Sequence, residues 1–158
     1  MFKEQKGQTL IETALVLTLL LLILLGISEF ARAWYMKNSL KNAARQGARV
    51  AVVTLQSSYP ANFMCDNNTN CNDSNLNPLI RAVCCQPGVP RKAAPENTIV
   101  TLECIDDITN NVIPCNTISA GDTVRVQDST TFLTIIHSFS PWIRDITITT
   151  DASMRYEL

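Results

Sequence analysis

An uncharged apolar segment near the N-terminus constrains the fold of this chain more than any other feature. Residues 13–27 (TALVLTLLLLILLGI) contain no ionisable side chain. As a helix they would extend about 22 Å at 1.5 Å per residue, whereas the hydrocarbon core of a bilayer is roughly 30 Å thick. A helix that crosses the bilayer must therefore include Glu12 or Glu29 as well.

Aromatic residues decide between these two glutamates. Phe30, Trp34 and Tyr35 follow the apolar segment, as in the belts of aromatic side chains that mark a membrane–water interface. This interface then lies on the C-terminal side of the span, and Glu12 lies at the opposite, cytoplasmic edge. A carboxylate at that depth is unfavourable, which indicates a partner or a function for Glu12.

Cysteines indicate on which side of the membrane the rest of the chain lies. Six of them follow the apolar segment and none precedes it: Cys65, Cys71, Cys84, Cys85, Cys104 and Cys115. This distribution favours a disulfide framework over a metal site, because there is no C-x-x-C motif and the single histidine, His137, is distant and interpreted as structural. The closest spacings favour Cys65–Cys71 and Cys104–Cys115, while the adjacent Cys84 and Cys85 leave other pairings open.

The charges on either side of the apolar segment favour opposite orientations. Lys3 and Lys6 precede it and favour a cytoplasmic N-terminus. Five cations follow it, which by the positive-inside rule alone would favour the reverse: Arg32, Lys37, Lys41, Arg45 and Arg49. Because disulfides need an oxidising compartment, we expect the N-terminus in the cytoplasm and the cysteines outside it.

The segment also resembles a removable signal peptide in one respect. Ala31-Arg32-Ala33 fits the A-x-A cleavage pattern, and cleavage after Ala33 would release a secreted domain. Glu29, Phe30 and Arg32 argue against this alternative, because small neutral residues are preferred before such a site. The apolar segment is also long for a signal peptide.

Helical sequence continues beyond the apolar segment. Residues 28–55 contain no proline and a single glycine, and good helix formers dominate. Their apolar residues recur at three- and four-residue steps, which predicts an amphipathic helix. One face of it is made of small residues: Ala43, Ala44, Gly47, Ala48 and Ala51. Small residues allow close approach of a neighbour, so this face is expected to pack against the chain's own sheet, against copies of the helix, or both.

The C-terminal part of the chain has the alternation of half-exposed strands. Three segments alternate, residues 98–105, residues 122–127 with a continuation to about 136, and residues 145–158. A short helix is predicted over 78–86, capped by Asn77 and ended by Gly88. We therefore expect an α+β fold, in which the long helix covers the apolar face of a small antiparallel sheet.

Residues 57–77 are predicted to form a solvated loop. The stretch 66–70 (DNNTN) begins like a calcium-binding loop, but Cys71 replaces the turn glycine and Asn77 the bidentate glutamate. No catalytic motif is recognisable, and a net charge of −1 gives no reason to expect a nucleic acid partner. The sequence thus predicts a chain that is not an enzyme and uses no cofactor or metal.

The N-terminal residues resemble a processing site. Lys6-Gly7 followed by Gln8 to Glu12 (QTLIE) and an apolar run is similar to the N-terminus of prepilins. In that class a short basic leader ends in glycine, and a glutamate stands five residues after the cut. Cleavage after Gly7 would make Gln8 the first residue and Glu12 the fifth, and the new amino group could pair with a carboxylate of a staggered subunit.

A more specific resemblance is to the TadE-like family of the tight adherence (Tad) pilus system. It rests on residues 26–32 (GISEFAR), residues 40–49 (LKNAARQGAR) and, more weakly, the ending 151–157 (DASMRYE). The likeness covers residues 6–53 and, more weakly, 122–157. Thr18 stands where members often have proline, and Glu12-Thr13 departs from the glutamate–aromatic pair of the major pilins, which argues against the bulk filament subunit.

The resemblance implies a minor pilin or pseudopilin in assembly of a Tad-type pilus. The expected organisation is a leader (1–7), a transmembrane helix (8–28), an amphipathic extension (29–56) and a disulfide-bonded extracytoplasmic domain (57–158). The implied location is the cell inner membrane, and the implied partners are other pilin-like subunits, the pilus or secretion machinery and a prepilin peptidase. The alternatives are a permanently anchored binding or adhesion module and a domain secreted after cleavage at Ala33.

Overall fold

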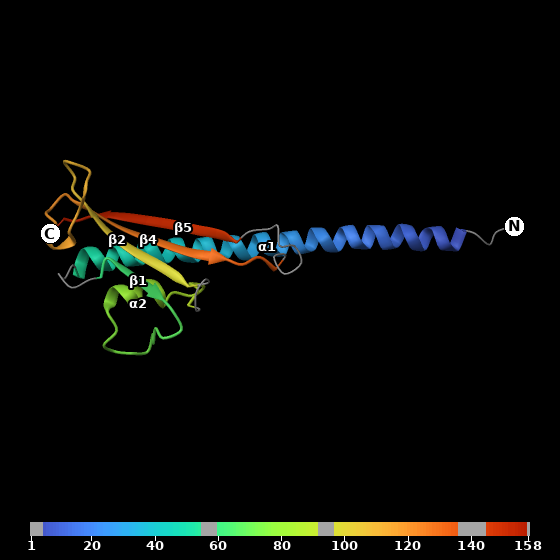
Figure 1. Ribbon diagram of the computed structural model, residues 1–158, viewed down its shortest axis with the longest axis horizontal. Helices are drawn as coiled ribbons and strands as arrows, with labels where there is room; N and C mark the ends of the chain where they lie inside the picture. Colours follow the sequence, from blue (N-terminus) through green and yellow to red (C-terminus); the bar gives the residue numbers. More distant parts are fainter. Residues whose placement is uncertain (1–4, 55–59, 92–96, 136–144, 158) are drawn as a thin grey trace. The chain divides into compact units, whose positions relative to one another are not determined.

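The chain forms one long helix and a mixed region of strands and short helices (Figure 1). The structure, a computed structural model, describes residues 5–54, 60–91, 97–135 and 145–157, with side chains from Gly7 onward. His137 and residue 136, the expected end of the second predicted strand, lie outside these ranges. The chain divides into two compact units, Met1–Trp34 and Tyr35–Leu158. Each is described separately below.

Helix α1 spans Gln5–Thr54 and supplies residues to both units. It contains no proline, and leucine and alanine, two of the best helix formers, are its commonest residues. In the first unit its large apolar side chains are exposed, from 71% at Leu10 to 49% at Leu25. In the second unit its exposed and buried residues alternate with helical period, so only this part has the amphipathic pattern of a helix that covers a core.

The second unit contains a five-stranded sheet in which every pairing is antiparallel. The strands are β1 (Asn62–Cys65), β2 (Thr98–Ile105), β3 (Val112–Ile113), β4 (Thr123–Phe132) and β5 (Ile146–Arg155). Their order is β1-β2-β4-β5, and β3 pairs with the end of β2. The pairing of β2 with β4 at the centre of the sheet is long and runs from Thr98 opposite Thr130 to Ile105 opposite Thr123. The predicted α+β fold with an antiparallel sheet is confirmed.

The core of the second unit lies between the sheet and α1. Val100, Val124 and Val126 of the sheet are fully buried, and Leu40 of α1 joins the same apolar cluster. Gly47 brings the two layers close together: a Cβ at this position would lie 3.3 Å from Val126 and 2.5 Å from Val83. The close approach explains why the smallest residue stands here in a helix interior, where glycine is otherwise unfavourable.

Helix α2 (Pro78–Cys84) packs beside β1, and its Leu79 and Val83 belong to the same apolar cluster. Asn77 caps it as predicted, because its side-chain oxygen accepts a hydrogen bond from the Leu79 N–H at 2.9 Å. Pro78 at its start lacks the N–H that the first turn would leave unpaired. Beyond the helix, Gly88 has φ +81°, a conformation that favours glycine.

Two sequence predictions are wrong in this region. Residues 57–77 were expected to be a loop, but β1 lies within them and pairs with β2, because only four residues alternate there and so short a strand gives little periodicity. The bond Cys65–Cys71 does not form. Cys65 pairs with Cys84 and Cys71 with Cys85, whereas the predicted Cys104–Cys115 bond is present.

Candidate functional site

The apolar helix of the first unit is the main candidate for a functional element. A window of 18 residues in α1 has a mean hydropathy of 2.7, and none of that window is buried. It is the one helix in the described ranges that is long and apolar enough to cross a membrane. Exposed leucines in such number are unfavourable in water at about 25 cal/mol per Å², so this surface is suited to lipid or to other apolar helices.

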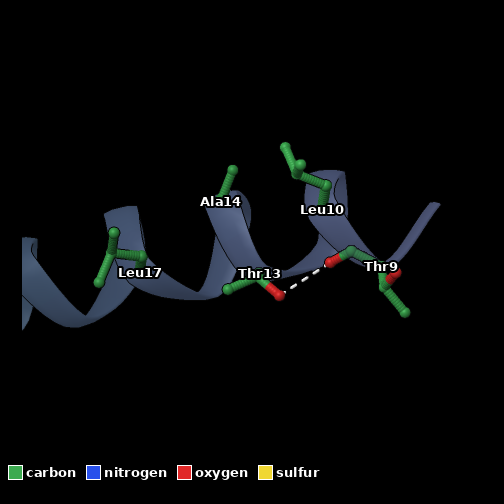
Figure 2. Close-up of a pocket in the computed structure, with 5 residues that line it drawn as sticks. All are labelled: Thr9, Leu10, Thr13, Ala14 and Leu17. Atoms are coloured by element: carbon green, nitrogen blue, oxygen red, sulfur yellow. Dashed lines mark hydrogen bonds between the residues drawn. The ribbon is translucent and has the colours of Figure 1, made fainter. Parts of the chain in front are cut away.

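Hydroxyl groups within the apolar helix bond to its own backbone. Figure 2 shows the Thr13 hydroxyl directed at the Thr9 carbonyl oxygen, 2.8 Å away. Thr18 donates in the same way to Ala14 at 2.8 Å, and Ser28 to Leu25 at 2.9 Å. A polar group without a hydrogen bond would oppose transfer into hydrocarbon. These three hydroxyls therefore do not oppose membrane insertion.

The two glutamates that flank the apolar segment differ in their surroundings. Glu29 pairs with Arg32, one turn further along the helix, at 4.0 Å. Glu12 is exposed, and no cation pairs with it in the part of the chain that the structure describes. Phe30 stacks on Trp34 with ring centroids 6.0 Å apart, next to the Glu29–Arg32 pair. Charge pairing and aromatic residues thus coincide at one end of the segment.

The predicted processing residues lie at the start of α1. Gly7 and Gln8 are exposed, and a side chain at Gly7 would meet no other atom within 4 Å. Glu12 follows slightly more than one helical turn after Gln8. The site for cleavage after Gly7 stays a prediction, as does the alternative after Ala33, which lies within the same helix.

The small-residue face of α1 is buried inside the second unit. All five of its members are buried there: Ala43, Ala44, Gly47, Ala48 and Ala51. Gly47 faces Val83 and Leu79 of α2 and Val126 of β4. One of the two interpretations of this face, packing within the chain, accounts for its burial. Contact with other copies through the same face stays a prediction.

Three disulfides fasten the periphery of the second unit. Cys84 and Cys85 stand side by side at the end of α2 and bond to Cys65 at the end of β1 and to Cys71 in the following loop. The third bond joins β2 to the short 3-10 helix Cys115–Thr117. Because each bond restricts the unfolded chain, each is expected to stabilise the fold by about 2–4 kcal/mol.

Two acidic turns have structural rather than catalytic geometry. The Asp122 carboxylate accepts hydrogen bonds from the backbone of Ser119 and Asp107, and these bonds lower its pKa. Backbone hydrogen bonds from Thr109 and then Ile108 lower the pKa of Asp106. Both side chains close turns at the end of the sheet, as aspartates commonly do.

The loop that begins at Asp66 is closed by its own side chains. The Asp66 carboxylate accepts hydrogen bonds from the Asn68 N–H at 3.0 Å and the Thr69 hydroxyl at 3.2 Å. Among the described residues there is no group of three or more His, Cys, Asp or Glu side chains arranged to hold a metal ion. The geometry is that of a local turn.

One buried acidic residue, Asp128, was not predicted from the sequence. It lies on β4 between Val126 and Thr130 on the inward face and is fully buried. Neither carboxylate oxygen has a hydrogen-bond partner within the described ranges. Burial raises its pKa to about 7. The signal was present in the sequence, since the alternation that buries Val124 and Val126 also places Asp128 inward.

Comparison with known proteins supports the N-terminal resemblance. Residues 7–49 match the model of a family described as TadE-like protein, so the predicted TadE-like resemblance is confirmed for this segment. No curated protein and no solved structure matches the chain. The match covers the apolar helix together with most of the part of α1 that lies in the second unit.

Proposed function

We propose that this chain is a minor pilin or pseudopilin, a structural component in the assembly of a Tad-type pilus. The observation that carries the proposal is that the TadE-like match coincides with the apolar helix. In the proposal, residues 8–28 cross the inner membrane once, with the N-terminus in the cytoplasm. The disulfide-bonded unit lies outside the cytoplasm, where its bonds can form.

The proposed role is mechanical, not catalytic. A prepilin peptidase cuts after Gly7, and the new amino terminus at Gln8 faces the carboxylate of Glu12 on a neighbouring subunit. Support comes from Glu12 itself, which is exposed and has no ion-pair partner in the ranges described. In a medium of low dielectric such a charge is strongly unfavourable until it is paired.

The N-terminal sequence of the mature protein separates this role from its alternatives. The proposal predicts that the mature chain begins at Gln8. A chain that begins at Met1 would instead be a permanently anchored binding module, and one that begins at Trp34 would be a secreted domain. Either of these results would overturn the proposal.

Substitution of Glu12 tests the pairing. Glu12→Ala is expected to insert into the membrane normally but to be lost from sheared pili or from the purified assembly complex. Thr13→Ala is the matched control, because this neighbouring exposed side chain bonds only to the backbone of its own helix. Normal assembly of the Glu12→Ala variant would show that the glutamate has no pairing role.

A further inference from the structure

A row of cations follows one flank of α1 in the second unit. Its members recur every four residues and are all exposed: Lys37, Lys41, Arg45 and Arg49. The row extends about 18 Å along the helix axis. No aspartate or glutamate occurs between residues 30 and 65, so the charge of this row is not balanced locally.

Within the described ranges these four cations have no salt bridge, unlike the arginines of the sheet. Arg125 pairs with Glu103 at 3.6 Å, and Arg155 with Asp107 at 3.2 Å. None of the four cations of the row has a salt bridge or a side-chain hydrogen bond within the described residues. A row of like charges at i, i+4 spacing also destabilises the helix that carries it, so an external acidic partner would relieve an existing repulsion.

The opposite flank of α1 is already covered by the chain itself. Gly47 faces Val83 and Leu79 of α2, and a Cβ at Gly88 would touch the Ser39 hydroxyl oxygen. Ser39 and Lys41 lie two residues apart, roughly 160° around the helix. The cations therefore lie on the flank that α2 leaves open.

Strand β5 borders this open flank. The sheet order is β1-β2-β4-β5, and α2 contacts β1 at the far edge; Figure 1 shows α2 and β5 on opposite sides of the C-terminal part of α1. Among the described residues β5 pairs with β4 alone, so its other edge carries free backbone groups. Its inward apolar side chains are only half-buried: Ile148, Ala152 and Met154. On β4 the inward residues Val124 and Val126 are fully buried.

We propose that the β5 flank, defined as Lys37, Lys41 and Arg45 of α1 with Ile148, Ala152 and Met154 of β5, binds an acidic segment of another protein. The segment adds to the free edge of β5 as a strand, and only every second side chain faces α1. Along that side acidic and apolar residues follow one another, so that the carboxylates meet the cations and the apolar groups cover the apolar residues of β5. Addition of a strand to a free sheet edge is an established mode of peptide recognition. The surface rests on the second unit alone and holds whether or not the proposed pilus role does.

The positive charge of the β5 flank favours an acidic segment of another protein over two other occupants, a second copy of the chain and an anionic lipid surface. Two copies that met flank to flank would bring two identical rows of cations together, because segment 30–65 of each contains no carboxylate. An anionic lipid surface presents its charge in a layer of roughly 6 Å on each side of the bilayer. An upright helix would place only one or two members of an 18 Å row in that layer.

Binding of a defined peptide tests the proposal. The probe is a fluorescent ten-residue peptide in which every second residue is Thr and the residues between them are Glu and Val in turn, titrated with the full oxidised chain in a neutral detergent and followed by anisotropy. We expect saturable binding that weakens with salt. A peptide with Ser in place of each Val should bind more weakly, because it cannot cover the apolar residues of β5. No binding, or equal binding of the two peptides, would overturn the proposal.

A pair of matched variants separates the flank from net charge. Lys41→Gln with Arg45→Gln removes two charges from the row, and we expect about fivefold weaker binding for two partly exposed ion pairs. Asn67→Glu with Ser74→Glu lowers the net charge by the same two units at exposed positions of the loop between β1 and α2, and should have a smaller effect. Equal effects would show attraction by net charge only.

Two further results would assign the flank to a different occupant. Self-association of the chain that is lost in the Lys41→Gln, Arg45→Gln variant, measured by light scattering, would identify a second copy. Release of the peptide by phosphatidylglycerol micelles but not by phosphatidylcholine micelles would identify a lipid headgroup. Either result contradicts the proposal, and neither affects the N-terminal sequence that tests the pilus role.

Discussion

Residues 7–34 and 35–54 belong to one helix, yet their side chains have opposite surroundings. The first part carries large aliphatic side chains that are mostly half exposed or more, whereas the small residues of the second part are inaccessible. In soluble domains leucine, isoleucine and valine, like alanine and glycine, are among the residues most often fully buried. The contrast indicates that the first part has its apolar partner outside the chain, and the second has it within.

The surroundings of Gly26 and Gly47 differ in the same way. Gly26 in the first part has no atom within 4 Å of the position that a Cβ would occupy, whereas Gly47 in the second part lies against Val83. The same residue type therefore tolerates substitution in one part and not in the other. Measurements of stability after comparable substitutions in the two units can support or contradict this difference.

The largest effect is expected from pH acting on the second unit. Burial raises the pKa of Asp128 from 3.8 to about 7, so the folded state binds this proton more tightly than the unfolded state. Its contribution is complete below pH 3.8 and is lost as pH rises through 7, by about 4 kcal/mol. Asp128→Asn should therefore be about as stable as the wild type at pH 4 and clearly more stable at pH 8.

Urea-induced unfolding of the detergent-solubilised chain, followed by circular dichroism at both pH values, measures this difference. The comparison with Asp128→Asn is needed because Asp106 and Asp122, whose pKa values are lowered, stabilise the fold in the opposite direction as pH changes. A stability difference between variant and wild type that is the same at both pH values would exclude a buried, titrating Asp128.

Removal of one disulfide should have the next largest effect. Cys65→Ala with Cys84→Ala opens the bond between β1 and α2 and is expected to destabilise the second unit by about 3 kcal/mol. The helical signal of residues 7–34 should persist after the second unit has unfolded. Thermal melts monitored by circular dichroism would show two separate transitions, and a single transition would contradict the independence of the two units.

A larger side chain at Gly47 should destabilise the second unit to a smaller extent. Gly47→Leu forces α1 away from Val83 and Val126, and we expect a loss of about 2 kcal/mol, since overpacking outweighs the gain in helix propensity. Gly26→Leu is the control and should leave the urea midpoint unchanged. Equal behaviour of the two variants would argue against the close helix–sheet contact.

The smallest effect is expected at the start of α2. Asn77→Ala removes the hydrogen bond to the Leu79 N–H and should lower the free energy of unfolding by about 1 kcal/mol. Asn77→Asp retains an acceptor and should keep most of the stability. Urea titration of both variants distinguishes a cap from a residue that only occupies the loop.

The sequence was sufficient to predict the helices and strands that have long periodic patterns. Strand β2 has the predicted bounds, 98–105, and β5 (Ile146–Arg155) lies within the predicted segment 145–158, because ten alternating positions give a clear period of two. The cap at Asn77 follows from local chemistry. Strand β1 and the pairing of Cys65 with Cys84 could not be predicted in this way, since both depend on contacts between segments distant in sequence.

The candidate sites differ in the same way: one could be predicted from the sequence and the other could not. The apolar helix could be predicted because hydrophobicity alone defines it, and the TadE-like match covers it. The open flank beside β5 could not, because the cations of α1 and the half-buried residues of β5 are more than 90 residues apart in sequence. Only the sheet order and the position of α2 bring them to one side of the helix.

The disulfide connectivity has a consequence for the order in which the protein matures. During the proposed export from N-terminus to C-terminus, Cys65 and Cys71 emerge first, and their native partners Cys84 and Cys85 follow later. An oxidase acting on the emerging chain would join the two earliest thiols to each other. Correct pairing then requires either oxidation delayed until α2 has emerged or reshuffling by a disulfide isomerase.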